Sequence, residues 1–124
     1  MNRRRFLSFT ALGLASLPAT SLFAGGHGRL GTFKGASNHV TTGTAEVAGN
    51  QVNLLADFTF DGAPDPKVAL GKNGYDKNTL MGPLTSDKGA SSYAIPAGID
   101  ASEYNEVWIW CEKFNVPLGV AKLN

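Results

Sequence analysis

The chain has 124 residues, of which 17% are charged and 43% are hydrophobic, and its formal charge is +1. This length suits one small domain, and a near-neutral charge without a basic stripe argues against nucleic acid or an anionic membrane as a partner. The sequence contains one cysteine, which excludes an internal disulfide bond.

The N-terminus predicts an export signal over residues 1–24. Arg3-Arg4-Arg5-Phe6-Leu7 resembles the twin-arginine signal of bacteria, and an uncharged, moderately apolar run follows from Ser8 to Ala24. An uncleaved anchor is the alternative, but the run is shorter than the roughly 20 residues that span a bilayer. Cleavage after Ala24 removes three of the 11 basic residues and none of the 10 acidic ones, which leaves a formal charge of −2. We therefore expect a periplasmic or secreted protein whose mature chain has no transmembrane anchor.

The remaining residues predict a flexible lead-in over 25–29 and one all-β domain over 30–124. Short runs of β-forming residues alternate with Gly, Asn, Asp and Pro, and long helical periodicity is missing. The fold expected is a single small β-sandwich or β-barrel of about seven strands. The predicted strands lie at 30–35, 40–47, 51–60, 67–71, 91–95, 106–111 and 118–123, with a loop over 72–88 and one helical turn, capped by Asp100, over 100–104.

The clearest alternation runs from Gln51 to Phe60. Five apolar side chains share one face, and Gln51, Asn53, Asp57 and Thr59 share the other, which predicts one continuous, half-buried strand. Turn chemistry at Ala48-Gly49-Asn50 precedes it, so this strand and the segment 40–47 are predicted to form a hairpin. The apolar face consists of Val52, Leu54, Ala56, Phe58 and Phe60.

Both tryptophans and the cysteine lie in the run Val107-Trp-Ile-Trp-Cys111, so any specific hypothesis about function depends on this run. On a strand, Cys111 shares a face with Val107 and Ile109, and Trp108 and Trp110 share the opposite face. Because both faces are apolar, we expect a central strand that is covered on two sides.

Cys111 has two interpretations. A free cysteine commonly acts as a small buried hydrophobe. Against this, Cys111 lies at the end of its strand, near a turn where solvent could reach a functional thiol. Trp108 and Trp110 either pack against the protein or form a stacking wall for a planar ligand.

The residues alone predict no metal site. His39, Met81 and Cys111 invite a blue-copper interpretation, but neither His nor Met follows Cys111, which argues against it. The Cys-x-x-Cys-His run that attaches c-type haem is absent, and zinc or iron–sulfur sites need more thiolates. Hydrolase and phosphate-loop motifs are absent too, so a stand-alone enzyme is not expected.

Residues 30–123 resemble a known family. Tyr93-Ala-Ile-Pro96, Asp100, Tyr104 and the run from Val107 to Val116, with its Trp-Cys-x-x-Phe-Asn-Val core, are similar to the electron-transfer DM thirteen domain, which is often found beside DOMON domains. Upstream, Gly31-Thr-Phe33, His39 and Thr42-Gly-Thr-Ala45 add to the resemblance.

The resemblance implies an all-β redox module centred on Cys111, as a bare thiol or as a ligand to a prosthetic group such as haem. Trp108, Trp110, His39 and Phe114 are the other candidate residues around such a group. One departure is Ala63-Pro-Asp-Pro66-Lys-Val-Ala-Leu70, where many members have an aromatic-containing strand. If that strand lines a ligand pocket, the pocket is less aromatic here.

Three hypotheses follow. The first is an exported redox or electron-transfer accessory domain that uses Cys111 with an envelope redox partner protein. The second is a cofactor-free envelope binding module in which Cys111 is buried and structural. The third is a small thiol enzyme that pairs His39 with Cys111, for which the sequence holds no local signature. The sequence predicts no oligomeric state.

Overall fold

The computed structural model of the protein describes residues 28–124. The export signal predicted over 1–24 and most of the lead-in predicted over 25–29 lie outside these residues. Within them the fold is all-β, as predicted, and its helical elements are the 3-10 turns η3 (Lys77–Thr79) and η4 (Ala101–Glu103). The strands are β1 (Arg29–Gly35), β2 (Thr41–Thr42), β3 (Thr44–Ala48), β4 (Gln51–Leu54), β5 (Thr59–Phe60), β6 (Pro66–Gly71), β7 (Ser91–Ala94), β8 (Glu106–Cys111) and β9 (Val116–Leu123).

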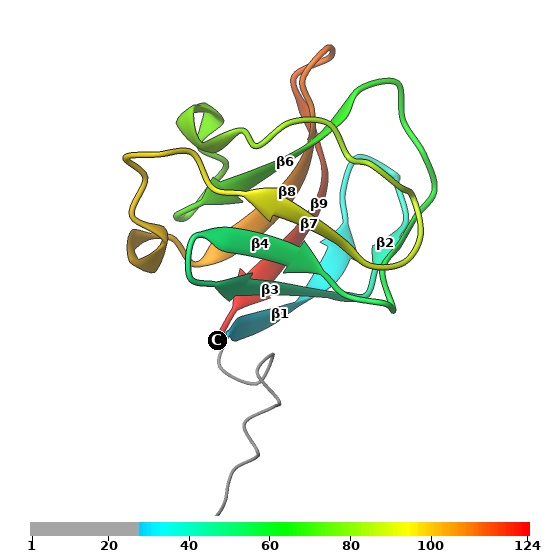
Figure 1. Ribbon diagram of the computed structural model, residues 1–124. Coiled ribbons are helices and arrows are strands. Elements are labelled where there is room, and N and C mark those ends of the chain that lie inside the picture. The colour runs from blue at the N-terminus through cyan, green and yellow to red at the C-terminus, as the bar shows by residue number, and fades with distance from the viewer. Residues whose placement is uncertain (1–27) are drawn as a thin grey trace, which may run out of the picture.

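Seven of the strands form one antiparallel sheet in the order β6-β8-β9-β1-β3-β4-β7. The sheet curls until it nearly closes into a barrel (Figure 1), so the barrel is the correct one of the two predicted architectures. Residues 81–84 cover the outer edge of β6, where Met81 N–H donates to Val68 O and Val68 N–H donates to Gly82 O. This edge therefore has backbone partners in place of a neighbouring strand.

The hairpin predicted around Gly49 and Asn50 is confirmed, because Ala48 pairs with Gln51 across β3 and β4. The single strand predicted over 51–60 is wrong. The chain leaves the large sheet after Leu54, turns, and re-enters as β5, which pairs with β2 in a separate two-stranded sheet.

A side chain on the polar face of the predicted strand stabilises this turn. The carboxylate of Asp57 accepts hydrogen bonds from the backbone N–H of Thr44 at 2.9 Å and from its Oγ1 at 2.8 Å, and Phe58 N–H donates to Leu55 O. Ala56 is consequently exposed, although it was expected on the buried face. The other four residues of the predicted apolar face are all buried, so the alternation persists through the turn.

The core lies inside the barrel and consists of residues that alternate along the strands. Phe33 and Phe58 pack edge to face at its centre, with ring centroids 5.4 Å apart. Its other fully buried large side chains are Leu54, Leu70, Ile109, Leu118, Val52, Val68 and Val107.

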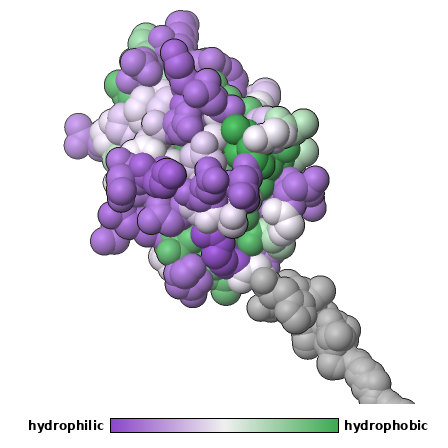
Figure 2. Space-filling view, turned by 90° about the vertical axis from the view of Figure 1, so that its left-hand side faces the viewer, coloured by the Kyte–Doolittle hydropathy of each residue, from purple (hydrophilic) through white to green (hydrophobic). Residues whose placement is uncertain are grey.

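The predicted helical turn is confirmed as η4, and Asp100 caps it by accepting a hydrogen bond from Ser102 N–H at 3.0 Å. The predicted loop over 72–88 contains η3, which Asp76 caps in the same way. The side of the molecule that carries both turns is mostly hydrophilic, with hydrophobic residues gathered toward one edge (Figure 2). A shallow polar hollow lies on the surface beside the two turns, and its lining includes Asp76, which precedes η3, and Tyr104, which follows η4. The Tyr104 hydroxyl donates a hydrogen bond to the Asp76 carboxylate at 2.9 Å.

Candidate functional site

Strand β8 has the position that the sequence predicts for its central strand. It lies between β6 and β9 and pairs with both over its whole length. Val107, Ile109 and Cys111 point into the barrel and are 0%, 0% and 1% exposed. Trp108 and Trp110 point outward, which confirms the predicted division of the strand into two faces.

Cys111 is a free thiol in the core. Its backbone pairs with Pro66 on β6 and with Val116 on β9. Of the two interpretations of its surroundings, the structure has the buried one: the strand does end there, but the side chain points inward and is 1% exposed. A thiol in this position is protected from attack by bulky reagents.

The outer face of β8 carries three aromatic rings, Tyr75, Trp108 and Trp110, which we term the outer aromatic cluster. The Tyr75 and Trp110 rings stack with centroids 3.8 Å apart and an interplanar angle of 10°. Trp108 meets Trp110 edge to face, with centroids 6.0 Å apart. Both tryptophans remain half-buried, so the prediction of a strand covered on two sides holds only for its inner face.

Small neighbours and hydrogen bonds fix the cluster. Gly71 has no side chain where a Cβ atom would collide with Nε1 of Trp108 and with the backbone oxygen of Gly74. Oε1 of Glu106 accepts hydrogen bonds from the Gly74 N–H at 2.9 Å and from Nε1 of Trp108 at 3.1 Å. The indole of Trp108 is therefore held over β6 by a buried carboxylate.

Tyr75 lies in the predicted loop, and the sequence did not place it beside the tryptophans. An isolated bridge between Gly71 and Tyr75 folds the chain back immediately after β6 and places the phenol ring on Trp110. Burial, and next the charges of Glu112 and Asp76, raise the pKa of Tyr75 above 10.0.

Charged side chains border the cluster on the β6 side. Lys67 forms ion pairs with Glu112 and with Asp65, the latter at 3.3 Å between Nζ and Oδ1. The hydrogen bond to Glu112 is the main cause that raises the pKa of Lys67, burial opposes it, and Asp65 adds to it. Trp110 lies opposite Lys67 in the register, and its Nε1 donates to Oδ1 of Asn115 at 3.3 Å.

The structure places His39 and Phe114 in separate surroundings. Nδ1 of His39 lies 2.9 Å from Oδ1 of Asp61, and its ring stacks on Phe60 with centroids 5.7 Å apart. The hydrogen bond from Val40 N–H, followed by the one with His39, lowers the pKa of Asp61. Phe114 is 58% exposed in the turn between β8 and β9, with Nζ of Lys113 5.5 Å from its ring centroid. Of the candidate residues, only Cys111, Trp108 and Trp110 therefore lie together, on β8, and His39 and Phe114 lie apart from them.

The surroundings of Cys111 do not fit a haem. The side chain is packed into the core. It lines neither the polar hollow beside Asp76 and Tyr104 nor a second surface hollow over β1 and β9. Within residues 28–124, no group of three or more His, Cys, Asp and Glu side chains is arranged to hold a metal ion. None of the helical elements in that same range has the length and apolar character needed to cross a membrane.

Fold and site together define a small all-β domain with one buried thiol behind a surface cluster of aromatic rings. The model of the family described as "Electron transfer DM13" matches residues 32–123, which is nearly all of this domain. The chain belongs to that family, and this membership suggests a role in electron transfer in the broad sense and hence a redox partner. No curated protein and no solved structure matches the chain.

Proposed function

We propose that the protein is an exported electron-transfer accessory domain of the bacterial cell envelope, in which Cys111 is the redox-active group. The observation that carries the proposal is that Cys111 lies within the match to a family described as an electron-transfer domain. It is the sole thiol of the chain, and it lies directly behind the outer aromatic cluster, one residue from Trp110. The signal predicted over residues 1–24 supports a periplasmic or secreted location.

Burial favours electron transfer over nucleophilic chemistry at this thiol. A nucleophile must touch its substrate, and Cys111 is 1% exposed. An electron can pass through packed side chains, and Trp110 and Tyr75 provide stacked rings between the strand and the surface. Restricted access also protects the sulfur from oxidation to sulfenic and higher acids.

The proposed step is a one-electron oxidation. The electron leaves Cys111 for a one-electron acceptor on a partner protein, and the thiol proton is lost to water that reaches the sulfur when the end of β8 opens locally. The resulting thiyl radical takes back an electron from a reduced donor protein and a proton from water. The partner proteins supply the oxidant and the reductant.

A second function is favoured by the same burial. If Cys111 serves only to fill the core, the protein is a cofactor-free binding module of the envelope whose contact surface includes the half-exposed tryptophans. The two functions differ in the expected effect of Cys111→Ala. This change removes one-electron activity in the first case. In the second it costs about 1 kcal/mol of stability through the cavity left behind and nothing else.

The first experiment is an absorption spectrum of the protein purified from its native envelope, before and after dithionite. The bare-thiol proposal predicts no Soret or charge-transfer band. A band that shifts on reduction and disappears in Cys111→Ala would instead make Cys111 a cofactor ligand.

The second experiment measures oxidation directly. The native protein is mixed with a photogenerated one-electron oxidant, and radicals are followed by electron paramagnetic resonance. We expect a sulfur-centred radical that is absent in Cys111→Ala, while Trp108→Phe retains it. An identical signal in Cys111→Ala would overturn the redox role of the thiol and favour the binding module.

A further inference from the structure

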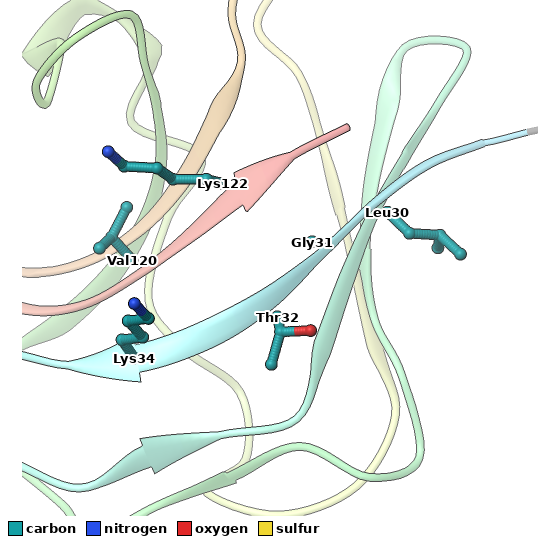
Figure 3. A pocket seen from close by; sticks show the side chains of 6 residues that line it. All are labelled: Leu30, Gly31, Thr32, Lys34, Val120 and Lys122. Carbon is teal, nitrogen blue, oxygen red and sulfur yellow. The ribbon is translucent and has the colours of Figure 1, made fainter.

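A surface hollow of about 380 Å³ lies on the outer face of the barrel, over β1 and β9. Its volume is within the range of small-molecule sites in proteins. Figure 3 shows the side chains of Lys34, Val120 and Lys122 on one side of β1, with Leu30 projecting at its far end. The lining consists of Leu30, Gly31, Thr32, Lys34, Val120 and Lys122, so it combines apolar side chains with two ammonium groups.

Gly31 brings the two strands together here. A Cβ atom at this position would collide with the backbone carbonyl group of Lys122, so only glycine allows β1 and β9 to approach this closely. In the register, Gly31 pairs with Leu123 and Thr32 pairs with Lys122. The hollow is therefore built on paired strands and not on a loop.

Neither lysine of the hollow has a carboxylate partner within the part of the chain that the structure describes. The ion pairs found there join His39 to Asp61 and Lys67 to Asp65 and Glu112. Lys34 and Lys122 are both exposed, and they lie on neighbouring strands. The two lysines are diagonal neighbours, because Lys34 pairs with Val120 and Lys122 pairs with Thr32, and an anion between them would relieve the repulsion of their like charges.

The carboxylates nearest in register have other hydrogen-bond donors. Glu106 is the cross-strand partner of Lys122, yet its Oε1 accepts from the Gly74 N–H and from Trp108. Glu46 is the cross-strand partner of Leu30, and its Oε1 accepts from Nδ2 of Asn53 at 2.9 Å. Both carboxylates are buried, at 4% and 5% exposure, and neither forms an ion pair with Lys34 or Lys122.

We propose that this hollow binds a small organic anion with an apolar body. Its acid group lies between the ammonium groups of Lys34 and Lys122, and its apolar body contacts Val120, which pairs with Lys34 in the register. Lysine is suited to this role because its ammonium group binds an anion as a point charge from a flexible stem. The site is separate from Cys111, so it does not depend on the redox role proposed for that residue.

The chemistry of the lining defines the ligand class. An inorganic anion would satisfy the lysines and leave Val120 in water. A neutral apolar compound would cover Val120 and leave the ammonium groups unpaired. An aromatic or short aliphatic carboxylate satisfies both halves of the lining.

The test titrates the folded protein with 2-naphthoate and follows backbone amide shifts by nuclear magnetic resonance. We expect shifts centred on β1 and β9, and binding that weakens as salt is added, since salt screens the exposed lysines. Lys34→Gln combined with Lys122→Gln should weaken binding about tenfold or more. Lys88→Gln combined with Lys113→Gln removes two exposed lysines outside the lining and should leave affinity within about twofold.

Two further probes separate the parts of the proposal. The neutral isostere 2-naphthylmethanol should bind about tenfold more weakly than the acid, and Val120→Thr should weaken naphthoate without affecting acetate. Shifts that map outside β1 and β9, equal binding of acid and alcohol, or equal affinity in both lysine pairs would overturn the proposal. Thermal unfolding of each variant confirms that a loss of binding is not a loss of fold.

Discussion

The two faces of β8 place alternate residues of one strand in opposite environments. Val107, Ile109 and Cys111 are at most 1% exposed inside the barrel, whereas Trp108 and Trp110 stay half-exposed outside. The inner face is held by apolar packing alone, and the outer face by ring stacking and by the hydrogen bonds of Glu106. Changes on the inner face should therefore report on the stability of the fold, and changes on the outer face on local order.

The largest effect is expected for Ile109→Ala. The side chain is fully buried in the core, on a strand that is paired with β6 and β9, and the cavity that its loss leaves should cost about 3 kcal/mol. Urea unfolding measures it. Glu112→Ala, one residue past β8 and outward-facing, is the control and should cost less than about 1 kcal/mol. Equal costs would remove the distinction between the two faces.

A smaller effect is expected for Gly71→Ala. The added methyl group collides with the indole of Trp108 and with the backbone of Gly74, and relieving this collision should cost about 2 kcal/mol. Near-ultraviolet circular dichroism should show the altered indole environment. Ala94→Gly removes a methyl group from an exposed position on β7 and should cost about 1 kcal/mol or less, without a spectral change. An unchanged Trp signal in Gly71→Ala would show that the glycine does not support the outer aromatic cluster.

Much of this arrangement follows from local sequence pattern. The bounds of β8, its two faces and the capped turn at Asp100 were predictable, because alternation and capping depend on residues that are neighbours in the chain. The break at Leu54 was not, because the hydrogen bonds from Thr44 to Asp57 join residues 13 positions apart. The alternation of Phe58 and Phe60 concealed the turn, since both remain buried after the chain changes sheet.

The site was less predictable than the fold for a similar reason. The sequence places Cys111, Trp108 and Trp110 together, because they share a strand. It gives no indication that Tyr75 stacks on Trp110 or that His39 pairs with Asp61, since these contacts depend on how loops fold back. The sequence also left the exposure of Cys111 open, because proximity to a turn does not decide it: the direction of the side chain does, and this side chain points inward.

Tyr75→Leu tests whether the outer face is ordered by stacking. The change keeps an apolar side chain but removes the ring that lies 3.8 Å from Trp110, so it should cost about 1 kcal/mol. Acrylamide should then quench tryptophan fluorescence more strongly, because Trp110 loses its cover. Phe114→Leu changes an exposed ring outside the cluster and should leave quenching unaltered. Unchanged quenching in both variants would mean that Tyr75 does not shield Trp110.

The smallest effect is the loss of folding stability at alkaline pH that the ionisation of Tyr75, on the outer face, should cause. Burial raises the pKa of Tyr75 above 10.0, so the folded protein holds the phenol proton more tightly than the unfolded chain does. As the pH rises above 10.0, the unfolded chain ionises first, and the contribution of Tyr75 to folding stability falls until the folded pKa is passed. The Tyr75 ring carbon shifts in nuclear magnetic resonance give this pKa directly.

Glu112→Gln refines this measurement. Glu112 is the larger of the two charged contributors to the raised pKa of Tyr75, so its neutralisation should lower that pKa while burial keeps it above 10.0. The same change removes the main cause of the raised pKa of Lys67. Ile109→Val, on the inner face, should leave the Tyr75 titration where it is in the unaltered protein. A Tyr75 pKa at or below 10.0 in the unaltered protein would show that the phenol is solvated and that the stack with Trp110 is open in solution.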